Sequence, residues 1–459
     1  METYDVIVVG GGNAGLVASI TAAELGKKVL LIEAAPPNER GGNTKYTRDI
    51  RYAHSSEDKF TSGEYTKIEL FNDLKGVSGD GFNQQLVNMV IDESESIPDW
   101  MLKHGIIFKG SIRGTLGLSR TNAFFLGGGK ALVNTYYRVA EKLGVKVLYS
   151  STLVDFNIKD NRCESIVVYS KEGEREIPVK SLILASGGFE ANVDKLKEVW
   201  GERANNFIVR GTKHNRGIPL FQLIKYGAET VGPKKGGHMV AVDARAPKFD
   251  GGIVTRIDAI PVGIVLNKRG ERFYDEGEDM WPKRYAIWGQ LIAEQPDQIA
   301  YAIIDSKMVN DFMPTAYPPI TAMSLDPLLS QLEIDKEKAV STINSYNQAV
   351  VEKGNCNLSI LDECHTVGIQ PPKSHWARKI DTPPFYAYPL KPGLTFTYMG
   401  LKVNKEARVL TSDGEFENIF ATGEIMSGNV LTRGYLGGFG LTIGTVFGWR
   451  AGEYASGKH

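Results

Sequence analysis

The N-terminal segment of the 459-residue chain places a glycine motif between a strand-like run and a helix-like run. Residues 6–9 form a continuous apolar stretch, which is typical of a parallel strand buried on both faces. Residues 10–15 then spell G-x-G-x-x-G, and residues 16–25 have the composition of a good helix. A second apolar run ends in Glu33. This succession of strand, glycine turn, helix, strand and acid predicts a dinucleotide-binding βαβ unit.

Each position of the motif has a physical role in such a unit. Gly10 makes the turn, and Gly12 lets a pyrophosphate approach the N–H groups at the start of the helix. Gly15 lets the helix touch the strand, and Glu33 accepts hydrogen bonds from the adenosine ribose. We therefore expect cofactor contacts at Gly10, Gly12, Asn13, Ala14, Gly15 and Glu33.

The 50 glycines of the chain gather at further predicted strand ends. One cluster follows almost at once, in Gly41, Gly42, Asn43 and Thr44. An apolar strand at 181–185 runs into Ser186, Gly187 and Gly188, and a strand at 419–424 precedes the glycine-rich segment 434–440. Clusters near both ends of the chain are expected if the first and last segments share one sheet around one long cofactor. This pattern favours FAD over NAD.

The pattern of predicted elements changes in the third quarter of the sequence. Short strands such as 260–266, proline-bearing loops and an amphipathic polar helix at 336–352 replace the glycine-rich pattern. We expect an α/β protein, in which a discontinuous Rossmann-like FAD-binding domain carries an inserted α+β capping domain, with the substrate cleft between them. The predicted ranges are 1–232 and 377–459 for the FAD-binding domain and 233–376 for the capping domain.

Global features exclude several other classes. The 53 basic and 54 acidic residues leave a net charge of −1, which argues against a nucleic-acid partner. The cysteines, Cys163, Cys356 and Cys364, lack the spacing of a metal or iron–sulfur site. No apolar run is long enough to span a membrane, and the N-terminus has no signal-peptide pattern. We therefore expect a cytoplasmic protein without a metal site or direct membrane insertion.

Together these segments resemble the flavoprotein subunits of fumarate reductases and succinate dehydrogenases along the whole chain. The resemblance is carried by residues 10–15, 41–44, 186–189, 421–424 and the glycine-rich C-terminal segment. Within that family, four stretches resemble the branch of FAD-dependent tricarballylate dehydrogenases, namely residues 120–130, 275–285, 395–400 and 440–448.

The resemblance implies how the cofactor is held. Covalent members carry a flavin-linked histidine in the segment matched by Asn43, so the FAD is expected to be non-covalent here. Gly423 and Glu424 match the family's contact to the ribityl chain, while Gly438 and Phe439 match the turn and helix start at the flavin edge. The branch passes its electrons to a separate, membrane-associated iron–sulfur protein, which is the expected partner.

The resemblance also implies substrate residues, with departures. Fumarate reductases place a histidine and an arginine for carboxylates where this chain has Thr397 and Tyr435. The proton-transferring arginine of the family is matched by Arg284, and a histidine of the capping domain by His238. The resemblance thus implies that the chain keeps an arginine for proton transfer, whereas two positions that bind substrate carboxylates in fumarate reductases hold other residue types here.

Desaturation of an anionic substrate needs fixed cations and a proton acceptor, and Arg is suited to bidentate carboxylate recognition. Candidate cations are Arg48, Arg51, Arg120, Arg256, Arg284 and Arg433. Since Arg is a poor base, Glu276 or Glu278 is a candidate relay. Tyr398 and Tyr435 either polarise a carbonyl or pack on the flavin.

Three hypotheses follow. The first is an FAD-dependent dehydrogenase that oxidises a small polycarboxylate, tricarballylate to cis-aconitate by resemblance, and a fumarate-type reductase is an alternative to it. The second keeps the flavin chemistry but acts on a ketone-bearing ring, because related 3-ketosteroid dehydrogenases use a tyrosine where this chain has Tyr435. The third is a non-catalytic flavin-binding assembly protein.

Overall fold

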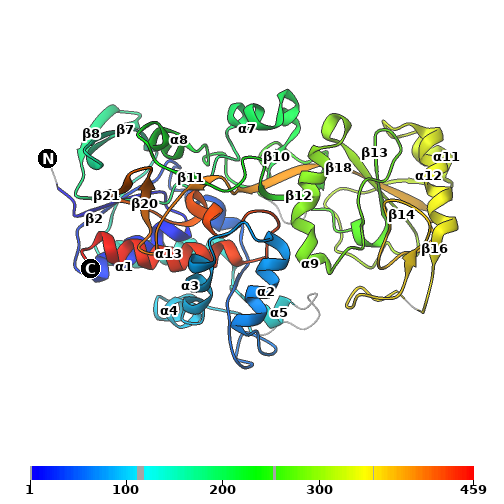
Figure 1. The fold of residues 1–459 in the computed structure, drawn as a ribbon, viewed down its shortest axis with the longest axis horizontal. Helices are drawn as coiled ribbons and strands as arrows, with labels where there is room; N and C mark the ends of the chain where they lie inside the picture. Colours follow the sequence, from blue (N-terminus) through cyan, green and yellow to red (C-terminus); the bar gives the residue numbers. More distant parts are fainter. Residues whose placement is uncertain (1–2, 111–117, 252–254, 355, 459) are drawn as a thin grey trace. The chain divides into compact units, whose positions relative to one another are not determined.

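The computed structural model describes residues 3–110, 118–251, 255–354 and 356–458, and these form two compact units (Figure 1). The first unit comprises Met1–Lys195, Gly211–Gly237 and Phe396–His459. The second comprises Leu196–Arg210 and His238–Thr395. The second unit extends past residue 376, the predicted end of the capping domain. The reason is that strand β18 (Phe385–Thr397) pairs within the sheet of this unit.

A six-stranded sheet forms the centre of the first unit. Its neighbours pair in parallel except at one edge, where β20 runs antiparallel to β21. β1, with the sequence VIVV, is buried at every residue, as the apolar run predicts for an inner strand. The strand order is β20 (Arg408–Thr411), β21 (Gly414–Ala421), β9 (Ser181–Leu184), β1 (Val6–Val9), β2 (Val29–Ile32) and β5 (Lys146–Leu148).

The register of this sheet brings the carboxyl ends of its strands to one edge. Val9 is paired with Ile32 on one side and with Leu184 on the other, and Leu184 is paired in turn with Ala421. The segments that follow these four strands therefore leave the sheet side by side. Since each of them carries a predicted cofactor segment, the sheet gathers those segments along one edge.

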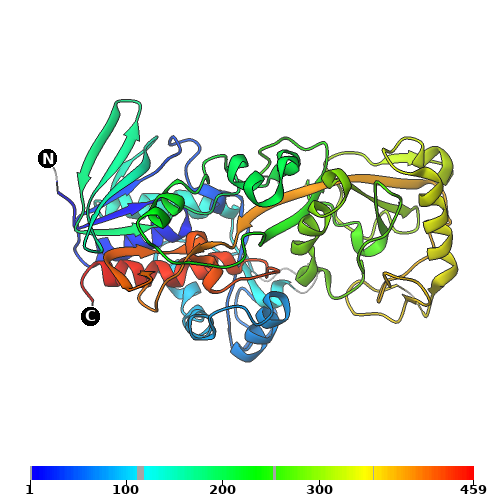
Figure 2. The same ribbon diagram turned by 45° about the horizontal axis from the view of Figure 1, so that its top comes forward.

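Helices α1 (Asn13–Glu24) and α13 (Phe439–Ala455) lie side by side in the first unit, blue and red in Figures 1 and 2. Three glycines four residues apart on α13, Gly444, Gly448 and Gly452, face α1. A Cβ built on Gly448 would lie 2.9 Å from a methyl carbon of Val17, so the close approach of the two helices requires glycine there. The first and last segments of the chain are thus packed into one layer.

The remaining elements of the first unit surround this core. A three-stranded antiparallel sheet, β6 (Thr152–Lys159), β7 (Arg162–Ser170) and β8 (Gly173–Pro178), is visible as a separate ribbon in Figure 2. Two short pairs are β3 (Asp49–Arg51) with β4 (Asn122–Phe124) and β11 (Thr230–Val231) with β19 (Gly400–Leu401). The further helices are α2 (Lys67–Ser78), α3 (Gln84–Ser94), α4 (Ile97–Lys103), α5 (Leu118–Thr121), α6 (Gly128–Lys142) and α8 (Ile218–Lys225).

The second unit is built on a sheet around the long strand β18. β14 (Ala300–Asp305) pairs with it antiparallel, β10 (Ile208–Val209) pairs with it in parallel, and β13 (Ile264–Asn267) extends the sheet beyond β14. β12 (Gly237–Asp243) and β15 (Ile320–Ala322) also pair with β18. Its helices are α9 (Trp281–Arg284), α10 (Trp288–Ala293), α11 (Leu325–Leu329) and α12 (Lys336–Ala349); α7 (Val193–Trp200) spans the boundary between the units.

Two predicted elements of the second unit differ in extent. The helix predicted at 336–352 ends at Ala349, and Val350–Val351 form the short strand β16, which pairs with β17 (His365–Thr366). The buried residues Ala339, Ile343 and Tyr346 pack α12 onto the sheet, as the amphipathic spacing predicts. The predicted strand at 260–266 begins with a 3-10 turn, Ile260–Val262, because Pro261 fixes φ near the helical value and has no N–H.

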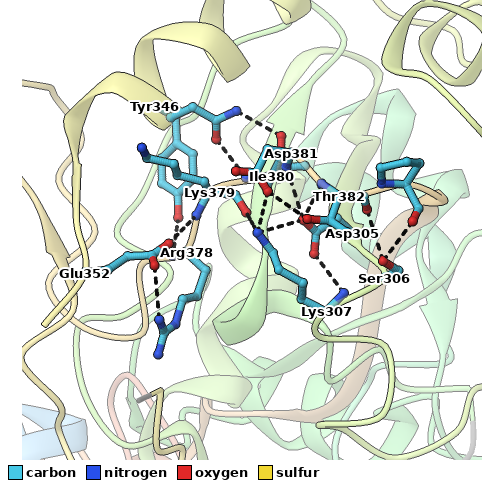
Figure 3. A network of polar contacts seen from close by, with 12 residues as sticks. Asp305, Ser306, Lys307, Tyr346, Glu352, Arg378, Lys379, Ile380, Asp381 and Thr382 are labelled. Carbon is cyan, nitrogen blue, oxygen red and sulfur yellow. Dashed lines mark hydrogen bonds and ion pairs between the residues drawn. The ribbon is translucent and has the colours of Figure 1, made fainter. Parts of the chain in front are cut away.

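A network of hydrogen bonds and ion pairs lies at the C-terminal end of β14 (Figure 3). The carboxylate of Asp305 accepts hydrogen bonds from the backbone N–H groups of Asp381 and Thr382 at 3.1 and 3.0 Å. Lys307 forms ion pairs with both Asp305 and Asp381. A small cavity of about 180 Å³ lies beside this network, lined by Lys307, Met308, Glu352, Cys356 and Arg378. Since Arg378 pairs with Glu352, the cations of this cavity are matched by carboxylates.

Among the described residues, no helix has the length and apolar character that crossing a lipid bilayer requires.

Candidate cofactor and substrate sites

The glycine motif forms a tight turn between β1 and α1. Gly10 has a φ of +106°, and a Cβ there would lie 2.3 Å from the carbonyl oxygen of Ala185. A Cβ on Gly15 would lie 1.8 Å from the carbonyl oxygen of Gly10. Gly12 differs, because the nearest atom to its Cβ position is Thr44 Oγ1 at 3.4 Å. The turn therefore needs glycine at two positions for the fold, while a Cβ at the third would make only ordinary van der Waals contacts.

The N-terminus of α1 has the character of an anion site. Gly12 is the N-cap and supplies no side-chain cap, and the first turn holds no acidic residue. The buried side chain of Asn13 donates to Thr445 Oγ1 at 3.0 Å on α13, while the N–H of Asn13 donates to Thr44 Oγ1 at 2.9 Å. Ala14 follows within the same first turn. Uncapped N–H groups at a helix start favour a phosphate.

Glu33 lies buried directly after β2, at the edge of the sheet. Its carboxylate accepts hydrogen bonds from the N–H groups of Gly11 and Ala35 at 3.2 and 2.8 Å and from the hydroxyl of Tyr137 at 3.3 Å. These donors fix the carboxylate next to the glycine turn. A carboxylate can accept further hydrogen bonds, so this arrangement fits a role with ribose hydroxyls.

The cluster at 41–44 forms a short regular turn. Gly41 is left-handed, with a φ of +100°, and Gly42–Tyr46 form a 3-10 helix. A Cβ on Gly41 would lie 2.7 Å from Val133. Asn43 donates to Glu190 at 2.8 Å, and its carbonyl oxygen accepts from the N–H of Thr212 at 2.8 Å. Asn43 therefore ties this turn to the segment after β9.

The segment after β9 contains Ser186 and the glycines Gly187 and Gly188. Gly187 has a φ of +74°. Among the described residues, the buried Ser186 hydroxyl and one oxygen of Glu190 have no hydrogen-bond partner. Gly423, with a φ of +80°, opens the corresponding segment after β21, and Glu424 follows it. The start of α1, the buried polar atoms and the glycines at adjoining strand ends fit a long dinucleotide.

The start of α13 lies at the C-terminal glycine turn, and the N–H of Phe439 there donates to the Leu436 carbonyl at 3.1 Å. Gly438 caps α13 with a φ of +83°, and a Cβ there would lie 2.8 Å from the backbone nitrogen of Arg51. Phe439, the first residue of α13, is fully buried. Arg51, a candidate for substrate binding, instead braces this turn, since its Nε donates to the Gly437 carbonyl at 3.0 Å. Its Nη1 donates to the hydroxyl of Tyr65 at 2.9 Å.

The candidate tyrosines are buried beside the same turn. The hydroxyl of Tyr398 donates to the Gly434 carbonyl at 2.8 Å, and the hydroxyl of Tyr435 accepts from the N–H of Gly440 at 2.9 Å. Phe396 packs against both rings. Thr397 does not replace a substrate histidine, because its N–H and hydroxyl bind Glu424 at 2.8 and 3.3 Å. Tyr398 and Tyr435 therefore hold the backbone around the glycine turn, and Thr397 holds the Glu424 carboxylate.

In the second unit, the structure assembles a cationic cluster around His238, which lies buried on β12. The His238 ring packs edge-on against Tyr285, with centroids 5.4 Å apart, and the guanidinium of Arg256 lies over Tyr285 at 4.8 Å. Burial, and after it the positive charges of Arg210 and Arg256, hold the pKa of His238 well below its usual range. A neutral histidine beside two guanidinium groups is suited to receive an anion.

The arginines of this cluster are held in place. Arg256 forms a two-point ion pair with Asp258, with nitrogen–oxygen distances of 2.8 and 2.6 Å. Asp258 also accepts from the indole N–H of Trp281 at 2.8 Å. Arg210 follows β10, and its Nη1 donates to Thr395 Oγ1 at 3.3 Å. These contacts fix the geometry of both guanidinium groups.

Arg284 ends helix α9 and is mostly buried, with 21% of its side chain exposed. Its Nε lies 3.1 Å from Glu278 Oε2, and Glu278 accepts from the hydroxyl of Tyr274 at 2.7 Å. Glu276, the other candidate relay, instead forms a fully buried ion pair with Arg272 and accepts from the N–H of Val265 at 2.9 Å. The structure therefore places Glu278 at Arg284 and gives Glu276 a structural contact.

The other candidate arginines lie elsewhere on the first unit. Arg48 pairs with the neighbouring Asp49 at 3.4 Å. Arg120 pairs with Glu69 and donates to the Glu64 carbonyl at 2.8 Å. Arg433 is exposed two residues before Tyr435. Of the predicted arginines, the structure brings only Arg256 next to the predicted histidine among the described residues.

A mostly parallel sheet whose strand ends meet a glycine turn and the start of helix α1 defines a dinucleotide-binding α/β protein. The family model described as the FAD binding domain matches residues 5–441. The chain belongs to this family, and FAD is its cofactor, as predicted.

Curated relatives match nearly the whole chain. It is 28% identical to an NADH:acrylate oxidoreductase of Vibrio harveyi, over 99% of this chain and 50% of the relative. It is 25% identical to an NADH:fumarate oxidoreductase of Klebsiella pneumoniae (strain 342), over 99% of this chain and 48% of the relative. The chain thus spans about half the length of these two relatives.

A solved structure shares the fold. The 3-ketosteroid-delta4-(5alpha)-dehydrogenase from Rhodococcus jostii RHA1, determined in complex with 4-androstene-3,17-dione, aligns with a TM-score of 0.75. The alignment covers 99% of this chain and 97% of that chain at 23% identity. The likeness confirms the predicted α/β fold class.

Proposed function

We propose that the protein is an FAD-dependent oxidoreductase that acts on the CH–CH bond of a small polycarboxylate. The proposal rests above all on the cluster of Arg210, Arg256 and His238, because two fixed guanidinium groups beside a neutral imidazole suit carboxylates. The likeness to oxidoreductases named for fumarate and acrylate, both unsaturated carboxylates, supports the same substrate class. Tricarballylate, oxidised to cis-aconitate, is the substrate that the sequence resemblance favours.

In this proposal the residues of the chain divide into three roles. The segments after β1, β9 and β21 and the start of α13 hold FAD non-covalently, and bound FAD supplies the hydride acceptor. Arg256 and His238 bind and orient a substrate carboxylate. A proton leaves the carbon next to the oxidised one toward Arg284, and the carboxylate of Glu278, 3.1 Å from Arg284 Nε, accepts a proton in exchange. The product carries one carbon–carbon double bond more than the substrate.

The electrons must then leave on a partner. A separate redox protein is the acceptor in this proposal, with an iron–sulfur protein favoured by the sequence resemblance. The relatives named for NADH suggest a second arrangement, in which a nicotinamide donor drives the reverse reduction. The direction of the reaction is therefore part of what the assay must measure.

Turnover of the purified holoprotein tests the proposal. Tricarballylate, succinate and 4-androstene-3,17-dione would each be offered with a dye as electron acceptor, and cis-aconitate and fumarate with a reduced dye or NADH as donor. We expect dye reduction with tricarballylate and none with the steroid. Turnover of the steroid without turnover of any carboxylate would reject the proposal in favour of the ketone hypothesis. Flavin binding without turnover of any substrate would favour the assembly-protein hypothesis.

A further inference from the structure

Two carboxylates from distant parts of the chain meet inside the first unit. Glu190 lies in the segment after β9, and Glu424 lies in the segment after β21, strands that are neighbours in the sheet. The side chain of Glu190 is fully buried, and Glu424 is 9% exposed. Glu190 is not among the residues that the sequence predicts for the cofactor site.

The position of Gly188 shows how close the two groups are. A Cβ built on Gly188 would lie 2.2 Å from Glu424 Oε1 and 2.9 Å from Glu190 Oε2. One amide also contacts both acids, since Asn215 Nδ2 lies 2.7 Å from Glu190 Oε1 and 3.5 Å from Glu424 Oε2. Glycine at 188 is therefore required by the carboxylates that flank it.

The partners of this pair are neutral. Glu190 accepts from the amides of Asn43 and Asn215, and Glu424 accepts from the N–H and hydroxyl of Thr397. Among the described residues, no cation forms an ion pair with either acid. Two like charges this close in a buried site cannot both be stable without a cation. Burial raises the pKa of both carboxyls, and the charge of Glu190 raises the pKa of Glu424 further.

The pair joins the segments that line the cofactor site. Asn43 belongs to the 3-10 helix at Gly42–Tyr46, Glu190 follows the glycines after β9, and Glu424 follows Gly423 after β21. Loss of the last proton would leave two charges at this junction and drive the segments apart. The positions of all three segments thus depend on one protonation state.

We propose that Glu190 and Glu424 share a single proton and act as a positioning pair for FAD, so that FAD binds most tightly while that proton is present. The shared proton lies between the segments that follow β9 and β21. The pair affects FAD binding indirectly, by positioning the segments that it joins. The inference concerns cofactor binding and does not depend on the identity of the substrate.

Other titratable groups lie on the same segments and must be separated from the pair. Lys45 donates to the backbone carbonyl of Glu39 at 2.7 Å. Lys213 and His214 both pair with the Glu39 carboxylate, at 3.0 and 3.1 Å. All three contact Glu39, and among the described residues none of them forms an ion pair with Glu190 or Glu424. His214 requires its own control because it directly precedes Asn215, whose amide binds Glu190 at 2.7 Å.

FAD binding to apoprotein prepared from the holoprotein tests the proposal without any assay of activity. Flavin fluorescence would give the Kd between about pH 6.5 and pH 8.5 for wild type, the double variant E190Q/E424Q, and H214Q. We expect the wild-type Kd to rise by about tenfold over this range through loss of one proton. The double variant should show no such rise, and H214Q should keep the wild-type slope.

Several outcomes would overturn the proposal: a flat wild-type Kd, an unchanged slope in the double variant, or a slope abolished by H214Q. If the double variant does not fold, infrared spectroscopy of the wild-type apoprotein decides. A carboxylic-acid C=O band that persists above about pH 6, where ordinary carboxyls are ionised, supports the shared proton. Absence of that band contradicts it.

Discussion

The guanidinium of Arg256 stacks over the ring of Tyr285, 4.8 Å from the ring centroid, and the guanidinium nitrogens form an ion pair with Asp258. His238 packs edge-on against the same ring. One aromatic side chain therefore sets the distance between the predicted histidine and its nearest predicted arginine. If this group binds a substrate carboxylate, changes to Arg256 must act on substrate binding.

We predict that Arg256→Gln raises the KM for tricarballylate by about 10- to 100-fold, because a charge-assisted hydrogen bond contributes ~1.5–3 kcal/mol. Arg245→Gln is a matched control. Arg245 has the same two-point pairing, with Asp243, and the same stacking, 5.2 Å from the ring of Tyr317. Steady-state kinetics of both variants would decide, and equal KM values for the two would contradict the assignment of the carboxylate to Arg256.

Substitutions of the two candidate relay acids should have different effects, one on stability and the other on turnover. Glu276→Gln breaks the buried ion pair with Arg272 and should lower the free energy of unfolding by about 3–5 kcal/mol. Glu278→Gln should leave stability nearly unchanged while it lowers kcat. Denaturant unfolding and turnover of both variants measure this, with Glu271→Gln, in an exposed pair with Arg269, as the stability control. A stable Glu276→Gln protein with low kcat would reverse our assignment.

Glycines in the first unit should respond in opposite directions. Gly15→Ala places a Cβ 1.8 Å from a backbone oxygen, so it should abolish FAD binding or folding. Gly76→Ala, inside α2 with no atom within 4 Å of the added Cβ, should stabilise the protein by about 0.5–1 kcal/mol. Thermal unfolding and flavin content of the two variants test the pair of predictions. A Gly15→Ala protein with full flavin content would show that the turn can relax.

The acid pair predicts a pH dependence of stability. Burial raises the pKa of Glu190 from 4.5 to about 7, so the folded state binds more protons than the unfolded state between these values. Its contribution is complete below about pH 4.5 and is lost as the pH rises toward about 7, on the order of 3 kcal/mol. Urea unfolding at about pH 5 and pH 7.5 should show this loss in wild type relative to E190Q/E424Q. Identical pH profiles of stability for wild type and E190Q/E424Q would show that the acid pair does not contribute to this pH dependence.

Local patterns were enough to predict the cofactor half of the fold. The apolar runs at 6–9 and 181–185 and the glycine turn between strand and helix are encoded by neighbouring residues, so β1, β9 and α1 form where expected. Glycine at 10 and 15 is required by backbone approach. Such requirements are visible in a sequence because they depend on residues a few positions apart.

Contacts between distant segments could not be predicted in the same way. Glu190 and Glu424 come together because β9 and β21 are neighbours in one sheet, and Arg210 and His238 come together where β10 and β12 both pair with β18. Arg51 has a common residue type near a glycine segment, and only the structure shows that it braces a backbone turn. Glu276 pairs with Arg272, four residues before it, but this segment is not helical, so the spacing alone does not predict the ion pair.

The most direct test of the central proposal is an anaerobic titration of the purified holoprotein with tricarballylate, followed by the flavin absorbance and by quantification of cis-aconitate. We predict bleaching of the oxidised flavin band together with one cis-aconitate per flavin reduced, and no bleaching with 4-androstene-3,17-dione. An unchanged flavin spectrum with tricarballylate, alongside bleaching by the steroid, would contradict the assignment of a polycarboxylate substrate.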